Sequence, residues 1–175
     1  MIPYFAYGAN RTLEMMEWIT GKSGFRGERA ILEGWIMGIQ KLNQVPKVIV
    51  PTSVGPRPLR EHLLTEWGDQ FKTYVITQGN GKVAGTLWKI TAEERELVRN
   101  WERVGFWYKE VRVKALTDNK QEVGAITEAL GDNQSFAEKI NGLTYNSFLF
   151  PKAVFKVRAK YARLGYYKRM KLMKT

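Results

Sequence analysis

The opening of the chain holds residues whose types and order suit the binding of an anion or of a developing oxyanion. A strand-like run, Tyr4-Phe5-Ala6, leads directly into Tyr7-Gly8-Ala9-Asn10, and Thr12 then has the residue type of a helix N-cap. Gly8 tolerates a positive φ angle and lets the backbone approach a ligand closely. A strand that enters a helix in this way exposes several backbone N–H groups in one concave place. Residues 7–10, the opening bend, are therefore the first candidate site.

The second candidate is a glutamate in aromatic surroundings. Glu102 follows Trp101 and precedes Phe106 and Trp107, at the expected C-terminal end of a helix. Such surroundings remove water from a carboxylate, which raises its pKa and makes it a better proton acceptor near neutral pH. A helix C-terminus also disfavours negative charge. Glu102 is thus a candidate general acid/base, and the alternative is a surface carboxylate paired with a neighbouring arginine.

Short strands dominate the segments that must position these residues. Apolar and β-branched runs predict strands at residues 2–7, 34–40, 48–50, 71–77, 82–90, 108–116 and 122–130. Gln78-Gly79-Asn80-Gly81 predicts a hairpin turn, because Asn and Gly accept positive φ. A second hairpin is expected around residues 117–120. Many strands with few helices between them indicate an α+β fold, with a small, mixed, mostly antiparallel sheet that curls into a barrel.

Helices are expected at residues 12–20, 59–67 and 135–140, after Thr91, and after Pro151. Thr91 and Glu94 have the spacing of a capping box, and Pro151 suits a first helical turn. In the last helix Val154, Val157, Tyr161 and Leu164 share one face, and Lys152, Lys156, Lys160 and Arg163 share another. Gly165 is expected to end that helix, so residues 166–175 are expected to form a basic tail. Residues 1–150 are taken as one domain, and residues 151–175 as a helix and tail packed on it or extending from it.

Composition excludes several kinds of site. The chain has no cysteine and a single histidine, His62, which excludes disulfides, thiol nucleophiles and multi-histidine zinc sites. No segment approaches the length of apolar residues that spans a bilayer, and no secretory signal is visible, so we expect no membrane contact and a cytoplasmic protein.

The positive charge is concentrated near the C-terminus. The net charge is +11, and all 17 acidic residues lie at or before Glu138, so the segment from Lys139 to Thr175 carries +10 of it. Such an asymmetry indicates contact with nucleic acid or an acidic protein through residues 152–175, or simply a solvated basic helix face.

Taken together, the motifs resemble the gamma-glutamyl cyclotransferase-like family. The order is Tyr7-Gly8-Ala9-Asn10, then Val83-Ala84-Gly85-Thr86-Leu87-Trp88, then a helix, Glu102, Gly105 and Tyr108 before a Val-x-Val strand. Gly34-Trp35-Ile36-Met37 resembles a further family strand. The resemblance implies a barrel-like sheet with a cavity at its mouth and no metal or cofactor. It also implies that Glu102 is the acid/base, that the opening bend holds the glutamyl part of the substrate, and that Tyr108 lines the cavity or donates a hydrogen bond.

This sequence departs from the family pattern at several positions. Ala9 stands where the family usually has serine, and Arg103-Val104 separates Glu102 from Gly105, whereas the family's glycine directly follows its glutamate. Residues 44–72 and 131–150 match nothing in the pattern. These departures bear on the substrate and on activity itself.

Two functions from different classes remain open on the sequence. One is an enzyme that releases 5-oxoproline and a free amine from a small gamma-glutamyl amine or peptide, or removes a gamma-glutamyl group from a larger molecule. The other is a non-catalytic binding module of the same fold, whose basic and aromatic C-terminal residues contact nucleic acid or an acidic partner.

Overall fold

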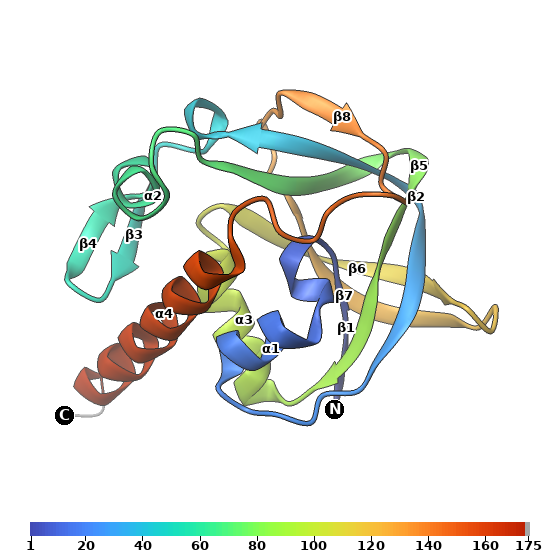
Figure 1. The fold of residues 1–175 in the computed structure, drawn as a ribbon, viewed down its shortest axis with the longest axis horizontal. Coiled ribbons are helices and arrows are strands. Elements are labelled where there is room, and N and C mark those ends of the chain that lie inside the picture. The colour runs from blue at the N-terminus through green and yellow to red at the C-terminus, as the bar shows by residue number, and fades with distance from the viewer. Residues whose placement is uncertain (174–175) are drawn as a thin grey trace.

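Five strands of the computed structural model, which describes residues 1–173, close into a barrel (Figure 1). Their order around the barrel is β5-β1-β7-β6-β2, and pairing of β2 with β5 closes the ring. The strands are β1 (Ile2–Ala6), β2 (Gly27–Lys41), β5 (Lys72–Ile90), β6 (Tyr108–Thr117) and β7 (Glu122–Leu130). β1 pairs parallel to β7, and the other barrel pairs are antiparallel. The expected mixed, mostly antiparallel barrel is confirmed.

The remaining elements surround this barrel. They are the short helix η1 (Gly8–Arg11), α1 (Leu13–Thr20), η2 (Leu42–Gln44), β3 (Ile49–Thr52), β4 (Gly55–Pro58), α2 (Leu59–Trp67), α3 (Ala92–Glu102), β8 (Glu138–Ile140) and α4 (Lys152–Leu172). In Figure 1, α2 and the β3–β4 hairpin lie to the left of the barrel, and α4 runs diagonally below them. No helix in residues 1–173 has the length and apolar character needed to span a membrane.

Alternation along β1 divides the core into two layers. Phe5 points into the barrel, where it packs with residues such as Leu32 and Ile76. Its neighbours Tyr4 and Ala6 point the other way, toward α1, α3 and α4. Successive strand side chains face opposite sides of a sheet, so one short strand contributes to both layers. A third cluster packs α2 against β5, β6 and β7.

The hairpin predicted at residues 78–81 is wrong, because β5 continues through this segment as one strand. Both halves of β5 pair with β2, from Lys41↔Lys72 to Gly27↔Trp88, with one irregularity between Glu33 and Trp35. The two strands bend together in Figure 1. At Gly81 a Cβ atom would lie 2.8 Å from the Trp35 carbonyl oxygen, so the residue serves close strand packing at the bend.

Two other local predictions are also wrong. The helix expected at residues 135–140 is absent, and Glu138–Ile140 instead adds strand β8 to the edge of β2. Gly165 does not end the last helix, which continues to Leu172, so most of the expected tail is helical. Gly165 is buried, and a Cβ atom there would lie 3.1 Å from Ser53 Cβ, which explains a glycine in the helix interior. Lys174 and Thr175, also assigned to the tail, lie outside the described residues.

The apolar face of α4 is largely exposed. Val157, Tyr161 and Leu164 are about half exposed, at 48%, 56% and 50%. The buried side of the helix instead carries Ala159 and Gly165, which are small enough for close packing. The contacts with α1 and α3 therefore bury a different side of α4 from the one that carries its regularly spaced apolar residues.

Candidate functional site

Several hydrogen bonds fix the opening bend. After β1 the chain turns at Gly8, whose φ of +61° favours glycine, and enters η1. The Thr12 hydroxyl accepts a hydrogen bond from Met15 N–H at the start of α1, as predicted for an N-cap. Trp88 Nε1 donates to the Asn10 carbonyl at 3.0 Å. Asn10 itself is buried, so its side chain is held in one place at the end of the bend.

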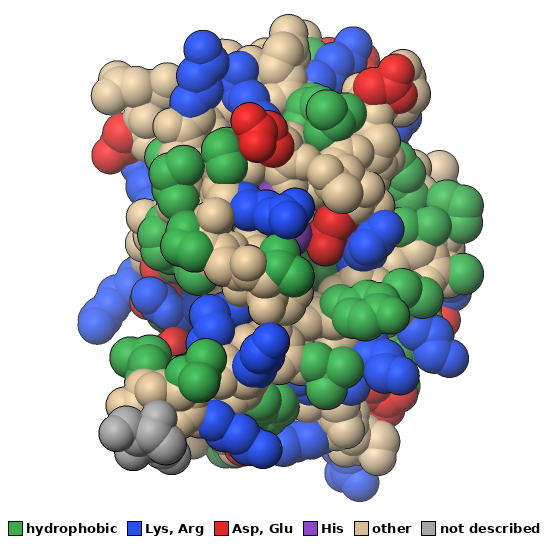
Figure 2. Space-filling model, turned by 90° about the vertical axis from the view of Figure 1, so that its left-hand side faces the viewer, with side chains coloured by type: hydrophobic (Ala, Val, Ile, Leu, Met, Phe, Trp, Pro, Cys, Tyr) green, Lys and Arg blue, Asp and Glu red, His purple; other side chains and the backbone are tan. Residues whose placement is uncertain are grey.

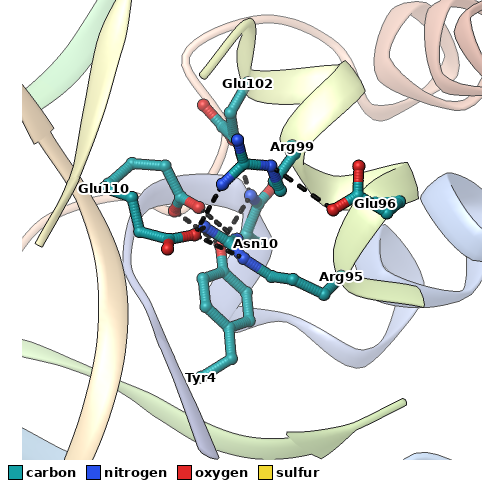
Figure 3. Close-up of polar contacts among 8 residues, drawn as sticks. Tyr4, Asn10, Arg95, Glu96, Arg99, Glu102 and Glu110 are labelled. Atoms are coloured by element: carbon teal, nitrogen blue, oxygen red, sulfur yellow. Dashed lines mark hydrogen bonds and ion pairs between the residues drawn. The ribbon is translucent and has the colours of Figure 1, made fainter. Parts of the chain in front are cut away.

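Glu102 reaches this bend from the end of α3. The predicted capping box of Thr91 and Glu94 begins the helix, and Arg103 ends it in the left-handed conformation with φ 54°. The side-chain amide of Asn10 donates to Glu102 Oε1 at 2.6 Å (Figure 3). Two segments more than ninety positions apart therefore meet in one pocket, and the alternative of a surface carboxylate paired with arginine is wrong.

The carboxyl of Glu102 has strongly altered acid–base behaviour. Burial, which disfavours the charged form, raises its pKa from 4.5 to about 8, and the negative charge of Glu128 acts in the same direction. The hydrogen bond from Asn10 and the charge of Arg95 oppose this shift. Glu102 is thus a carboxyl that exchanges a proton near neutral pH.

Glu128, on β7, is a fully buried acid near the partly buried Glu102, and the sequence analysis missed it. The Tyr4 hydroxyl donates to Glu128 Oε2 at 2.9 Å, and Asn10 Nδ2 lies 3.2 Å from the Tyr4 oxygen. Arg95 contacts Glu128 and Glu110 at 2.5 Å each. Figure 3 shows Arg95 reaching from α3 toward Tyr4 and Asn10. The sequence does contain a signal for this residue. Glu128 lies within the largely apolar run of residues 125–130, where burial of an unpaired charge costs free energy.

The inner part of the pocket contains every residue that the sequence analysis proposed for the site. Tyr7, Gly8, Ala9, Asn10, Glu102 and Tyr108 all line it. Burial raises the pKa of both Tyr7 and Tyr108 well above the ordinary value, so both phenols are neutral at pH 7. The Tyr108 hydroxyl donates to the Tyr74 carbonyl at 3.3 Å, and its ring stacks on Trp107 with centroids 4.7 Å apart. Tyr108 therefore forms a fixed wall.

One group of the bend is already engaged inside the protein. The Gly8 N–H donates to the Tyr145 hydroxyl at 3.2 Å, and this hydroxyl donates to the Ala84 carbonyl at 2.6 Å. Arg11, which directly follows the bend, does not line this pocket. Its guanidinium lies 3.9 Å from the Tyr145 ring centroid and bonds to Ser147 Oγ. Arg11 therefore secures the segment before α4.

Helices α2 and α4 and the segment before α4 provide an outer wall that the sequence analysis did not predict. Its lining residues are His62, Glu66, Trp67, Phe150, Phe155, Arg158 and Arg169. His62 lies beside the Arg103 guanidinium at 3.1 Å, and burial together with nearby arginines lowers its pKa to about 4. Because α4 forms part of this wall, a deletion of residues 152–175 would remove pocket-lining side chains together with the positive charge of the C-terminal segment. In residues 1–173 no three His, Asp or Glu side chains gather as a metal site.

Comparison with solved structures identifies the fold. A structure described as gamma-glutamyl cyclotransferase superposes with a TM-score of 0.57, at 19% identity over 79% of this chain and 70% of the other. The chain has the gamma-glutamyl cyclotransferase fold. An uncharacterized human protein matches over the same shares of both chains at 19% identity, with a TM-score of 0.56. A protein of Arabidopsis thaliana matches at 15% identity over 99% of this chain and 93% of its own, with a TM-score of 0.50. No protein-family model and no curated protein sequence matches the chain.

Proposed function

We propose that this protein is an enzyme that cyclises gamma-glutamyl amines or peptides, with release of 5-oxoproline and a free amine. The observation that carries the proposal is the Glu102 carboxyl, which titrates near pH 8 beside Asn10 of the opening bend. A peptide α-amino group has a pKa of about 8, and the free α-carboxylate of a gamma-glutamyl compound raises the pKa of its α-ammonium further. The raised pKa of Glu102 therefore brings its proton affinity closer to that of the α-amine than an ordinary carboxyl would be, which favours general acid–base catalysis in both directions.

The reaction is a rearrangement within the substrate followed by loss of the amine. Glu102, as a carboxylate, takes a proton from the α-ammonium, and the free α-amine attacks the γ-carbonyl carbon. The carbon–nitrogen bond to the departing amine then breaks as Glu102 returns the proton to that nitrogen. The second proton leaves the attacking nitrogen and follows the same route, so the amine departs as an ammonium and the carboxylate is regenerated. No water is consumed.

The opening bend has two roles in this proposal. Its backbone N–H groups beyond Gly8 stabilise the oxyanion that forms on the γ-carbonyl oxygen. Tyr7 of the bend, together with Tyr108 of β6, holds the glutamyl chain folded so that the amine and carbonyl meet, which replaces an encounter of two molecules by a step within one. Replacement of the family serine by Ala9 leaves this assignment intact, because the proposed donors are backbone groups.

The test is release of 5-oxoproline from a panel of gamma-glutamyl amines and peptides by wild type and by Glu102→Gln. We expect the substitution to reduce kcat/KM by at least about 100-fold, the lower range for loss of a general acid–base group. Glu96→Gln is the matched control, since Glu96 is an exposed acid on the same helix, ion-paired with Arg99. Absence of release by wild type from every compound, or full activity of Glu102→Gln, contradicts the proposal.

A further inference from the structure

Helix α4 packs with one side and leaves the other side in water. α1, α3 and the β3–β4 hairpin cover the side that carries Ala159 and Gly165. The helix has 21 residues, so its uncovered side is about 30 Å long. At about 100° per residue, its larger exposed side chains fall within one half of the helix circumference. This exposed side of α4 has no acidic residue and carries Lys152, Lys156, Val157, Lys160, Tyr161, Leu164, Tyr167, Lys168 and Lys171.

Most lysines of this exposed side have no acidic partner. Lys152 pairs with Glu14 at 2.7 Å. Tyr167 donates a hydrogen bond to Glu93 at 3.1 Å, and Glu93 also pairs with Lys22. Within residues 1–173, no ion pair and no side-chain hydrogen bond involves the four remaining lysines, Lys156, Lys160, Lys168 and Lys171. Four positive charges along the helix are therefore not neutralised by the protein itself.

Apolar side chains lie between these lysines. Val157, Tyr161 and Leu164 follow one another at spacings of four and three, so they form one stripe along the helix, and each is about half exposed. Val54, which is 71% exposed, adds an apolar side chain beside this stripe, because its neighbour Ser53 packs against α4. Figure 2 shows the face that includes α4 and the hairpin, where hydrophobic (green) side chains are interspersed with basic (blue) ones. Burial of these apolar side chains against another apolar phase is favourable.

The mixture of lysines and aliphatic side chains distinguishes between two kinds of anionic partner. Nucleic acid presents phosphates to lysine, but non-specific binding to it is electrostatic and gives aliphatic side chains no partner. An anionic bilayer presents negative headgroups next to an apolar acyl layer, so lysines and aliphatic side chains at one level both find partners there. Tyrosine is also enriched at the boundary between lipid and water. The exposed side of α4 therefore fits a bilayer better than a nucleic acid.

We propose that the exposed side of α4, together with the tip of the β3–β4 hairpin, docks the protein on an anionic lipid bilayer. The lysines contact the headgroups, and Val54, Val157 and Leu164 enter the boundary between headgroups and acyl chains. Tyr161 and Ser53 also line the pocket, so docking brings one rim of the pocket to the bilayer surface. Surface contact needs no spanning helix, and the proposal thus revises the expectation of no membrane contact. It does not depend on the proposed function.

The test is co-sedimentation of the full chain with large unilamellar vesicles at low ionic strength. Vesicles of equal parts phosphatidylserine and phosphatidylcholine are compared with vesicles of phosphatidylcholine alone. We expect partitioning onto the anionic vesicles to be at least about tenfold stronger, since each lysine near an anionic surface contributes about fivefold. High salt, which screens the charges, should weaken this binding.

A lysine variant connects the binding to α4. Lys156→Gln/Lys160→Gln should weaken partitioning onto the anionic vesicles by about 25-fold, which is about fivefold for each charge. The matched control is Lys109→Gln/Lys114→Gln, which removes two positive charges from β6, where both lysines pair with acids. This control has the same net charge as the lysine variant and should bind nearly as well as wild type.

An apolar variant tests the contact with the acyl boundary separately. Val157→Ser/Leu164→Ser keeps every charge and should weaken partitioning by about tenfold or more, because both side chains lose the free energy gained on leaving water. The matched control is Leu143→Ser. Leu143 is 45% exposed and lies in the segment before α4, outside the docking side, so this control should bind as wild type does.

Circular dichroism establishes that each variant is folded, and Lys168→Gln/Lys171→Gln replaces the lysine variant if that one is not. Equal partitioning onto neutral and anionic vesicles, or binding to neither, overturns the proposal. Full-strength binding by a folded lysine variant or a folded apolar variant also overturns it. Binding to duplex DNA in fluorescence anisotropy, without binding to the vesicles, assigns the charge to nucleic acid and overturns it as well. No substrate is used, so none of these results bears on the proposed function.

Discussion

The substitution Glu128→Gln tests whether the charge of this buried acid raises the proton affinity of Glu102. The two carboxyls are joined through Asn10 and Tyr4 by contacts of 2.6, 3.2 and 2.9 Å, so their oxygens are at most about 9 Å apart. At an effective dielectric constant of about 20, two charges at that distance repel by roughly 2 kcal/mol, which is about 1.4 pH units. Removing the Glu128 charge also leaves Arg95 less neutralised, which favours ionised Glu102 further.

The expected result is a decrease of one to two units, approximately, in the pKa of Glu102, from about 8 to roughly 6–7. If Glu102 is the general base, kcat/KM increases with pH as this carboxyl ionises. The acidic limb of the pH profile for 5-oxoproline release then moves to lower pH by the same amount. A limb due to the substrate's own ammonium group does not move, because the substrate is unchanged.

Glu122→Gln is the matched control for this profile. Glu122 lies on the same strand, β7, but is exposed and pairs with Lys114. Its substitution should leave the limb near pH 8. A Glu128→Gln enzyme that folds, as judged by circular dichroism, and keeps its acidic limb at the wild-type position would refute the coupling argued from the structure.

Three further predictions concern stability and the site. Because the pKa of Glu102 in the folded protein, about 8, exceeds its ordinary value of 4.5, its contribution to stability is complete below pH 4.5 and is lost as pH rises through 8. The Tm of wild type should therefore fall more steeply between pH 5 and 9 than that of Glu102→Gln, and parallel curves would contradict this. Asn10→Ala removes the 2.6 Å hydrogen bond that favours ionised Glu102, so the acidic limb should move to higher pH and kcat/KM should fall roughly tenfold or more, whereas Asn119→Ala in the β6–β7 turn should match wild type in both. Gly85→Ala should destabilise the fold by about 1–3 kcal/mol in urea unfolding, since its Cβ would lie 2.3 Å from the Ala6 carbonyl oxygen, while Gly124→Ala, with no atom within 4 Å, should have little effect.

Local sequence signals predicted the parts of the site that depend on short-range chemistry. The Gly8 turn, the Thr12 cap and the Thr91–Glu94 capping box each depend on residues within a few positions, and the structure has all three. The meeting of Asn10 with Glu102 came instead from the order of motifs in a family resemblance. No local rule places two residues so far apart in one pocket.

Features that depend on distant partners were not predictable in this way. Gly79-Asn80-Gly81 has the composition of a turn, yet pairing with β2 keeps it extended, because each added ladder contact outweighs a weak local preference. Glu128 and Arg95 appear as ordinary charges in the sequence, and their burial is explained only by their mutual contact across α3 and β7. The side of α4 that packs is likewise chosen by α1 and α3.

The position of β1 has a consequence for synthesis on the ribosome. β1 lies between β5 and β7, so this strand, which precedes both partners in the chain, has no lateral partner until residues up to Ile90 have emerged and no second one until Ile126. Such distant pairing delays folding and leaves an apolar strand uncovered in the nascent polypeptide. We therefore expect any truncated translation product that stops before β7 to lack the Tyr4–Glu128 contact, and to depend on chaperones until the rest of the barrel arrives.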